Sequence, residues 1–245
     1  MAVVAEKVAI NQKEEVVDKK LVRLWFYVSF FWLIVSMTFG GLVSIKFNYP
    51  DFLGYVPYFA MPRMRIAHLG GVALGWFTTA AIGMAYYMVP KLTGIKMKYP
   101  NLGYYLLYAW VPITLIGQWA LLSGYNQGVE VGEWPIWIDI PVVGVFALIT
   151  NQLFMTIAAR KEKHIYVSLW YLTAGFTWAS INYVVGNLIN PYFFTGVDNA
   201  AIQGFYLHSV VGLWITPMGT AMLYYFLPII TKNPVYSHKL SMLGF

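Results

Sequence analysis

The chain has 245 residues, of which 59% are hydrophobic and only 11% are charged, and its mean hydropathy is +0.60. A soluble domain carries about 25% charged residues, so this composition excludes an ordinary soluble protein and indicates a membrane protein. The chain has no cysteine, which excludes disulfides, thiolate–metal sites, iron–sulfur clusters and covalently attached haem c on it. Its first 23 residues are polar and charged, so no cleavable signal peptide is predicted.

Six stretches are long enough to cross a bilayer, since a spanning helix needs about 20 mostly apolar residues. Backbone polar groups in lipid must be hydrogen-bonded within their own segment, so we expect an all-α polytopic membrane protein. The predicted spans are 24–46, 66–90, 102–124, 135–159, 165–189 and 200–230. They divide the chain into a tail at 1–23, a six-helix transmembrane domain at 24–230 and a second tail at 231–245.

The Lys and Arg residues predict the orientation of the spans. Thirteen of the 16 lie in the two tails and in the second and fourth connections, whereas the other connections hold only Lys46, Arg63 and Arg65. The positive-inside rule then predicts that both tails are cytoplasmic. The formal net charge of +6 reflects this asymmetry, and no soluble basic domain is present that would indicate nucleic-acid binding.

Two of the four histidines fall inside predicted spans, where a polar side chain is costly unless something binds it. His68 lies near the start of the second span, one helical turn after Arg65. His208 lies about eight residues into the sixth span, roughly 12 Å deep at 1.5 Å per residue. Both spans are entered from the predicted outer side, so both histidines are expected in the outer half of the membrane, where they are candidate metal ligands.

Simpler explanations exist for these features. Either histidine alone could be a core residue bonded to a neighbouring helix. The glycines after His68 (Gly70, Gly71 and Gly75) are explained more simply by close helix packing than by a planar group approaching the backbone. Two intramembrane histidines at one end of the bundle nevertheless favour cofactors. His164 and His238 lie on the predicted cytoplasmic side and are interpreted as interfacial residues rather than ligands.

Three hydroxyl side chains follow His208 toward the predicted cytoplasmic side: Thr216, Tyr224 and Ser241. With bound water, hydroxyls spaced in this way can relay protons, although hydroxyls satisfied by their own helix are the commoner case. The sequence contains no P-loop, nucleophile-elbow or HExxH motif. Transport without metals remains open, but the spans lack the internal carboxylates that ion-coupled carriers usually use, and Asp139 near an outer end is the main exception.

Six segments are informative together: "FNYPDF", "RMRIAH", "GMAYYMVPKLTG", "EWPIWID", "RKEKHIYVSLWY" and "IQGFYLHSVVGLW…LYYFLP…NPVYSHKLS". Their order and spacing, over about residues 24–245, resemble those of the catalytic subunit I of C-family (cbb-type) haem–copper oxidases. "EKHIYVSLWY" and "NPVYSHKLS" are quite specific to that family, whereas the Arg-x-x-His element is shared with nitric oxide reductases.

The resemblance implies roles for the candidate ligands. His68 matches the axial ligand of a low-spin haem b, and Arg65 matches an arginine that contacts a haem propionate. His208 matches the first copper ligand of the reaction centre, where copper lies beside a high-spin haem b. Family members also bind calcium near the outer propionates, and Glu130 is a candidate ligand for it.

The resemblance also implies a proton path and a substrate. Thr216, Tyr224 and Ser241 match polar positions of the single proton channel of the family. Related nitric oxide reductases carry a glutamate one turn after the histidine, where it helps to hold iron, but the residue four after His208 is Gly212. Gly212 therefore favours copper and oxygen over iron and nitric oxide.

The six predicted spans account for only half of such a subunit. The family's subunit I has at least twelve helices, and the later ones supply the second axial haem ligand, two further copper histidines, the cross-linked tyrosine and the high-spin haem ligand. The resemblance therefore implies a second polypeptide with those helices, or a truncated product. It further implies c-type cytochrome subunits, a cytochrome c-like electron donor, O2 as substrate and a prokaryotic cytoplasmic membrane.

Three hypotheses follow from the sequence. The first is the N-terminal half of a split cbb-type oxidase that couples oxygen reduction to proton translocation. The second is a related respiratory reductase whose partner half has diverged toward nitric oxide. The third is a non-catalytic haem-binding or assembly subunit, or a fragment, in which His208 holds no metal.

Overall fold

The computed structural model describes residues 15–245, and every regular element in this part of the chain is helical. The elements in chain order are α2 (Lys19–Asn48), η1 (Pro57–Phe59), α3 (Met61–Gly70), η2 (Gly71–Thr78), α4 (Thr79–Thr93), α5 (Pro100–Ser123), α6 (Ile136–Ala158), α7 (Val167–Tyr183), η3 (Val184–Ile189), α8 (Asn190–Phe193), α9 (Gly196–Ser209), η4 (Val210–Ile215), α10 (Thr216–Thr231) and α11 (His238–Leu243). The first of the η elements is a short 3₁₀ turn, and η2, η3 and η4 are π-helical. The all-α prediction is confirmed.

Six long helical runs correspond to the six predicted spans, because α3, η2 and α4 are continuous, as are α7, η3 and α8 and also α9, η4 and α10. Five of these runs in the described part of the chain are long and apolar enough to cross a membrane. The run at 167–193 is not among the five. Its many Trp, Tyr, Ser, Thr and Asn side chains account for its lower hydropathy.

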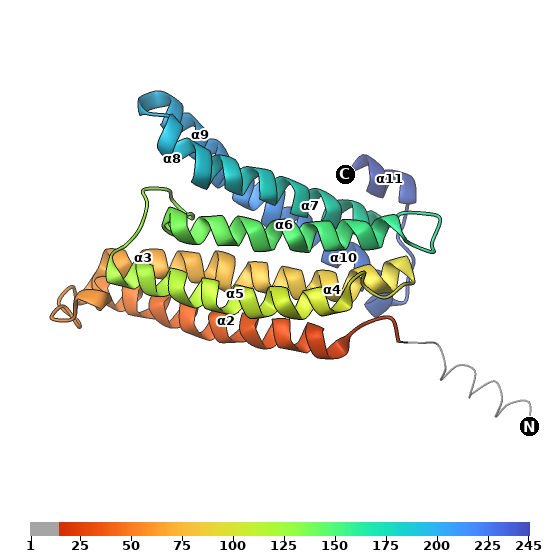
Figure 1. The fold of residues 1–245 in the computed structure, drawn as a ribbon, viewed down its shortest axis with the longest axis horizontal. Helices are drawn as coiled ribbons and strands as arrows, with labels where there is room; N and C mark the ends of the chain where they lie inside the picture. Colours follow the sequence, from red (N-terminus) through yellow and green to blue (C-terminus); the bar gives the residue numbers. More distant parts are fainter. Residues whose placement is uncertain (1–14) are drawn as a thin grey trace, which may run out of the picture.

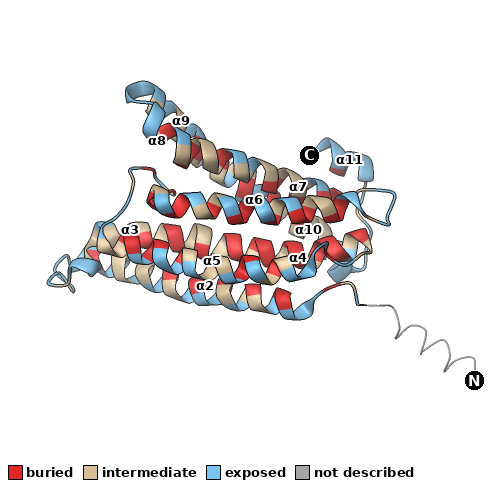
Figure 2. Cartoon of the chain, in the orientation of Figure 1, coloured by how far each residue is buried: buried red, intermediate tan, exposed pale blue. Residues whose placement is uncertain are grey.

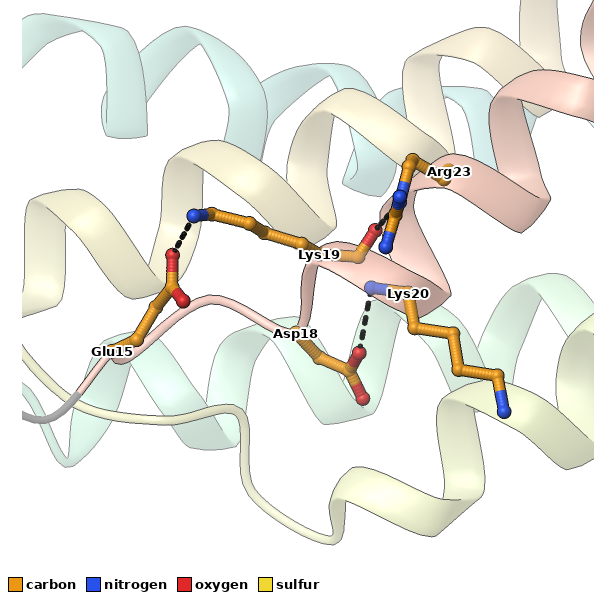
Figure 3. A network of polar contacts seen from close by, with 5 residues as sticks. All are labelled: Glu15, Asp18, Lys19, Lys20 and Arg23. Carbon is orange, nitrogen blue, oxygen red and sulfur yellow. Dashed lines mark hydrogen bonds and ion pairs between the residues drawn. The ribbon is translucent and has the colours of Figure 1, made fainter.

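The predicted boundary at residue 23 falls inside a helix. Asp18 is the N-cap of α2, and its Oδ1 accepts a hydrogen bond of 3.0 Å from the backbone N–H group of Lys20 (Figure 3). The same oxygen accepts a second bond of 3.0 Å from the backbone N–H group of Leu21. An aspartate satisfies otherwise unpaired donors at this position, so α2 begins at Lys19 rather than at the first apolar run. The rest of the predicted tail, residues 1–14, lies outside the described residues. The other predicted tail, 231–245, contains the short helix α11.

The bundle consists of two groups of three helical runs (Figure 1). In one group α2 packs against α3, η2 and α4, with α5 beside them; in the other, α7 packs against α6, η4 and α10. The groups meet where α5 and α4 contact α6. The described N-terminal segment and α11 lie at the same end of the bundle (Figure 1). We call the opposite end, which carries the connections 49–60, 124–135 and 194–195, the distal end.

The π-helical segment η2 is hydrogen-bonded to the second group. Thr78 Oγ1 donates to the Ala73 carbonyl oxygen at 2.8 Å and accepts from Trp214 Nε1, on η4, at 3.1 Å. In the same way Thr79 Oγ1 donates to a carbonyl oxygen five residues earlier and accepts from Trp110 Nε1 at 2.8 Å. These hydroxyls therefore satisfy both the wide backbone turn and the indoles of neighbouring helices.

The contact between α2 and η2 depends on glycine. A Cβ at Gly71 would lie 2.2 Å from Ser36 Oγ, and a Cβ at Gly75 would lie 2.7 Å from Trp32 Cγ. Both partners are buried side chains on α2. These glycines thus serve close helix packing, as the simpler of the two sequence interpretations proposed.

We expect Gly75→Ala to destabilise the protein by about 1–3 kcal/mol, because overpacking a filled interface forces side chains and backbone apart. The measurement is the thermal unfolding midpoint in detergent. Gly144→Ala is the matched control, because a Cβ on this α6 glycine meets nothing within 4 Å. Equal midpoints for the two variants would contradict the packing role of Gly75.

Candidate functional site

His68 lies on α3, three residues before η2, and α2 fixes the orientation of its ring. Its Nδ1 lies 2.8 Å from the backbone carbonyl oxygen of Ser36, which can only accept, so Nδ1 carries the proton. The ring also lies against Gly40, where a Cβ would be 2.8 Å from His68 Cε1. A histidine bonded in this way at Nδ1 keeps the Nε2 lone pair for a metal, and this is the usual arrangement of metal-ligating histidines. The residue therefore fits the axial haem ligand that the sequence suggested.

His208 lies on α9, two residues before η4, and its side chain is exposed on the surface of the bundle. The ring lies above Gly212 one turn later, where a Cβ would be 3.7 Å from His208 Nε2. No cluster of three or more His, Cys, Asp or Glu side chains that could hold a metal exists among residues 15–245. Within the described chain, His208 is thus a single nitrogen donor on an open face.

Each candidate ligand is followed closely by a π-helical segment, η2 after His68 and η4 after His208. π-Helical turns are rare and occur frequently at functional sites. The π-helical segments could not be predicted from the sequence, because their apolar residues are typical of an uninterrupted α-helix. Ser36 and Gly40 were also not singled out, although their spacing of four residues matches the small-residue pattern of close helix contacts.

The connection 124–135, which follows α5, contacts both helices that carry the histidines. Arg65 Nη2 lies 2.7 Å from Glu130 Oε1, in an ion pair whose side chains are about half exposed. On the other side, Gln203 Nε2 donates to the Glu130 carbonyl oxygen at 3.4 Å, and the Tyr206 hydroxyl donates to the Val131 carbonyl oxygen at 3.2 Å. Arg65, Glu130 and the two histidine-bearing helices therefore meet at the distal end.

The three predicted proton-path hydroxyls are not in one continuous row. Thr216 is exposed on α10. The half-buried Tyr224 stacks on Tyr171 of α7 with ring centroids 5.9 Å apart. Ser241 is buried in α11 and donates to the His238 carbonyl oxygen at 2.8 Å. Tyr171, which the sequence did not single out, also donates to the Gly244 carbonyl oxygen at 2.8 Å, so it connects Tyr224 with the helix of Ser241.

The remaining two histidines, His164 and His238, are exposed. The structure gives neither of them a side-chain hydrogen bond or ion pair. That neither is a ligand stays a prediction.

A cavity of about 380 Å³ lies between the two helical groups, and its wall is mostly apolar. Thr78, Trp110, Phe146, Asn182, Tyr183 and Trp214 are among the residues that line it. Neither His68 nor His208 does. The cavity is therefore separate from both candidate ligands.

These observations define a polytopic helical membrane protein with two histidines near the distal end. The family model "Cytochrome C and Quinol oxidase polypeptide I" matches residues 20–245, and the chain belongs to this family, the subunit I family of haem–copper oxidases.

Three curated relatives of this chain are named as cytochrome c oxidase subunits or their homologs. The chain is 30% identical over 236 residues to the Cbb3-type cytochrome c oxidase subunit CcoN1 of Stutzerimonas stutzeri, covering 92% of this chain and 49% of the relative. It is 28% identical over 235 residues to the cytochrome c oxidase subunit 1 homolog of Agrobacterium tumefaciens (strain T37), covering 92% and 43%. It is 28% identical over 247 residues to the cytochrome c oxidase subunit 1 of Rhodobacter capsulatus, covering 95% and 46%. The chain thus spans about half the length of the curated relatives it matches.

Proposed function

We propose that this chain is the N-terminal half of a split cbb-type oxidase catalytic subunit, which works together with a second polypeptide carrying the remaining helices. The complex reduces O2 to water with electrons from cytochrome c, and couples this reaction to proton translocation. It lies in the bacterial inner membrane with both ends of the chain in the cytoplasm. The single observation that carries the proposal is His68, whose Nδ1 is bonded to the Ser36 carbonyl oxygen so that Nε2 is available for a metal.

In this proposal the bound haems and copper supply the electron transfer and the oxygen chemistry. His68 would hold the low-spin haem b, and Arg65, now paired with Glu130, would neutralise a haem carboxylate. His208 supplies one copper ligand. Thr216, Tyr224 and Ser241 hold water for protons that enter from the cytoplasmic side. Glu130 at the distal end is the candidate calcium ligand.

The exposed face of α9–η4–α10 supports a protein partner. Only 22% of the most apolar part of this helical run is buried, against 56% for the run that carries His68. Exposed residues dominate α8 and the start of α9 (Figure 2). His208 and Thr216 lie on this face, and polar side chains facing lipid are unfavourable. A second polypeptide that covers the face also supplies the ligands that complete both metal sites.

The test is a pair of optical difference spectra on the complex purified through a tag on this chain. We expect a low-spin b-type signal in the reduced-minus-oxidised spectrum and a second haem that responds to carbon monoxide. Low-spin haem without a carbon monoxide response would contradict the oxidase function and indicate an electron-transfer or assembly role. A preparation without haem would exclude every haem-binding role for His68.

A further inference from the structure

Asp139 is a fully buried carboxylate in the first turn of α6. Its Oδ1 accepts a hydrogen bond of 2.6 Å from the Tyr183 hydroxyl on α7, and its Oδ2 accepts one of 2.5 Å from Gln127 Nε2. Neither of the two ion pairs among the described residues involves Asp139. A buried carboxyl held by two neutral donors, without a cation, can bind a proton at modest cost.

Four buried oxygens near this pair accept no hydrogen bond from the described residues: Asn182 Oδ1, Asn187 Oδ1, Asn190 Oδ1 and Glu133 Oε2. Each belongs to a side chain that is more than nine-tenths buried. Asn187 Nδ2 donates to the Tyr183 backbone carbonyl oxygen at 3.1 Å, so this amide lies one helical turn after Tyr183 on the same helical run. Because buried polar atoms are almost always satisfied, such a set of acceptors requires donors, and water is the donor small enough to serve them all.

The Asp139–Tyr183 pair lies between the cavity and the distal surface. On one side Tyr183 lines the cavity, next to Asn182 with its unpaired Oδ1. On the other side Gln127 Oε1 accepts a hydrogen bond of 3.3 Å from the hydroxyl of Tyr192, which is half exposed. The hydrogen-bonded series Tyr183–Asp139–Gln127–Tyr192 therefore runs from the interior to the surface.

The titratable groups in or beside this series come from three helices and one connection. They are Tyr183 on α7, Tyr192 on α8, Tyr206 on α9 and Glu133 in the connection before α6. Burial raises the pKa of the Glu133 carboxyl, while Arg65 acts in the opposite direction. None of these groups is a cation, so nothing opposite in charge competes with a proton for Asp139.

We propose that Asp139 is a proton-binding site at the distal end, which receives protons through Tyr183 and releases them to the distal surface. The inference rests on the proposed function, in which protons must leave on this side. In the transfer, the Tyr183 hydroxyl gives its proton to Asp139 Oδ1 while a protonated water on the Asn182 side gives a proton to the phenol oxygen and is left as neutral water. The carboxyl then returns to the carboxylate by giving its proton to water near Gln127 and Tyr192.

The test compares Asp139→Asn with wild type in the complete complex. Asparagine keeps the size of the side chain and can still accept from Tyr183, but it cannot bind the proton. We expect a protonated-carboxyl stretching band in the infrared pH-difference spectrum of the wild type, and its loss in Asp139→Asn. In vesicles, proton release to the distal side should slow by about 100-fold or more, the usual effect of removing a positioned proton-transfer group. Asp198→Asn, an exposed carboxylate at the same end, is the matched control and should change neither quantity.

A second variant keeps the inference testable if Asp139→Asn does not assemble. Tyr183→Phe retains the carboxyl and removes its donor, so the carboxyl band should shift to higher frequency and release should slow. A band and a release rate unchanged in Asp139→Asn or Tyr183→Phe would overturn the proposal. The infrared titration does not depend on oxygen reduction. A wild-type complex that consumes no oxygen would therefore contradict the proposed function, and the carboxyl band would still decide whether Asp139 binds a proton.

Discussion

His208→Ala is expected to remove copper from the complex and to abolish oxygen reduction, while the low-spin haem signal stays. His208 is exposed and belongs to no cluster of three or more His, Cys, Asp or Glu in the described chain, so under the proposed function it would be one ligand of a set shared with the partner polypeptide. Loss of even an indirect partner of a metal ligand typically costs roughly 10- to 100-fold in affinity or activity. We therefore expect oxygen consumption to fall by at least about 100-fold.

The measurements for His208→Ala are copper content by elemental analysis, oxygen consumption and the reduced-minus-oxidised spectrum. His164→Ala is the matched control, because His164 is equally exposed and lies far along the chain from any candidate ligand. Intact copper content and oxygen consumption in His208→Ala would reject the ligand role of His208 and favour the hypothesis of a non-catalytic subunit.

His68→Ala is expected to abolish the low-spin b-type signal, and with it electron entry, while leaving copper bound. The His68 ring is hydrogen-bonded to the Ser36 carbonyl oxygen and packs against Gly40, so the contact between α2 and α3 fixes its position. An alanine offers no nitrogen, and the neighbouring helices bring no second histidine among the described residues. The check is the low-spin band in the reduced-minus-oxidised spectrum, together with the copper content.

A smaller change tests the same geometry without removing the ligand. A Cβ at Gly40 would lie 2.8–2.9 Å from His68 Cε1 and Nδ1, whereas a Cβ at Gly41 meets nothing within 4 Å. Gly40→Ala should therefore shift the low-spin band and the haem midpoint potential, and Gly41→Ala should leave both at the wild-type values. If the two alanine variants behave alike, α2 does not position His68.

The sequence predicted the helical class, the six long runs and the two histidines because these depend on local properties. Hydrophobic length identifies spans, and a histidine within one stands out by chemistry alone. The start of α2 at Lys19 was missed because it depends on a single capping carboxylate, Asp18, rather than on hydropathy. The orientation, the ligand roles of His68, Arg65 and His208, the proton-path roles and the calcium ligand stay predictions.

The features of the fold and of the candidate site that could not be predicted from the sequence are those that depend on contacts between distant segments. The hydrogen bond from His68 to Ser36 joins residues 32 apart, and that from Tyr183 to Asp139 joins residues 44 apart. Asp139 was noted only as an unusual charge near a span end, since its partners Gln127 and Tyr183 carry no recognisable motif. The π-helical segments likewise depend on packing, because nothing in their composition distinguishes them from α-helix.

The hydroxyls of Thr78 and Thr79 have a mechanical consequence. A wide helical turn would ordinarily be a point at which a helix bends, but here each hydroxyl closes the turn and also accepts a hydrogen bond from an indole, Trp110 of α5 for Thr79 and Trp214 of η4 for Thr78. The turn is thereby braced across its width, and the helix of His68 and the segment after His208 form a stiff frame. Under the proposed function, the hydrogen bond from Trp214 to Thr78 would limit relative movement of the two helices that carry His68 and His208.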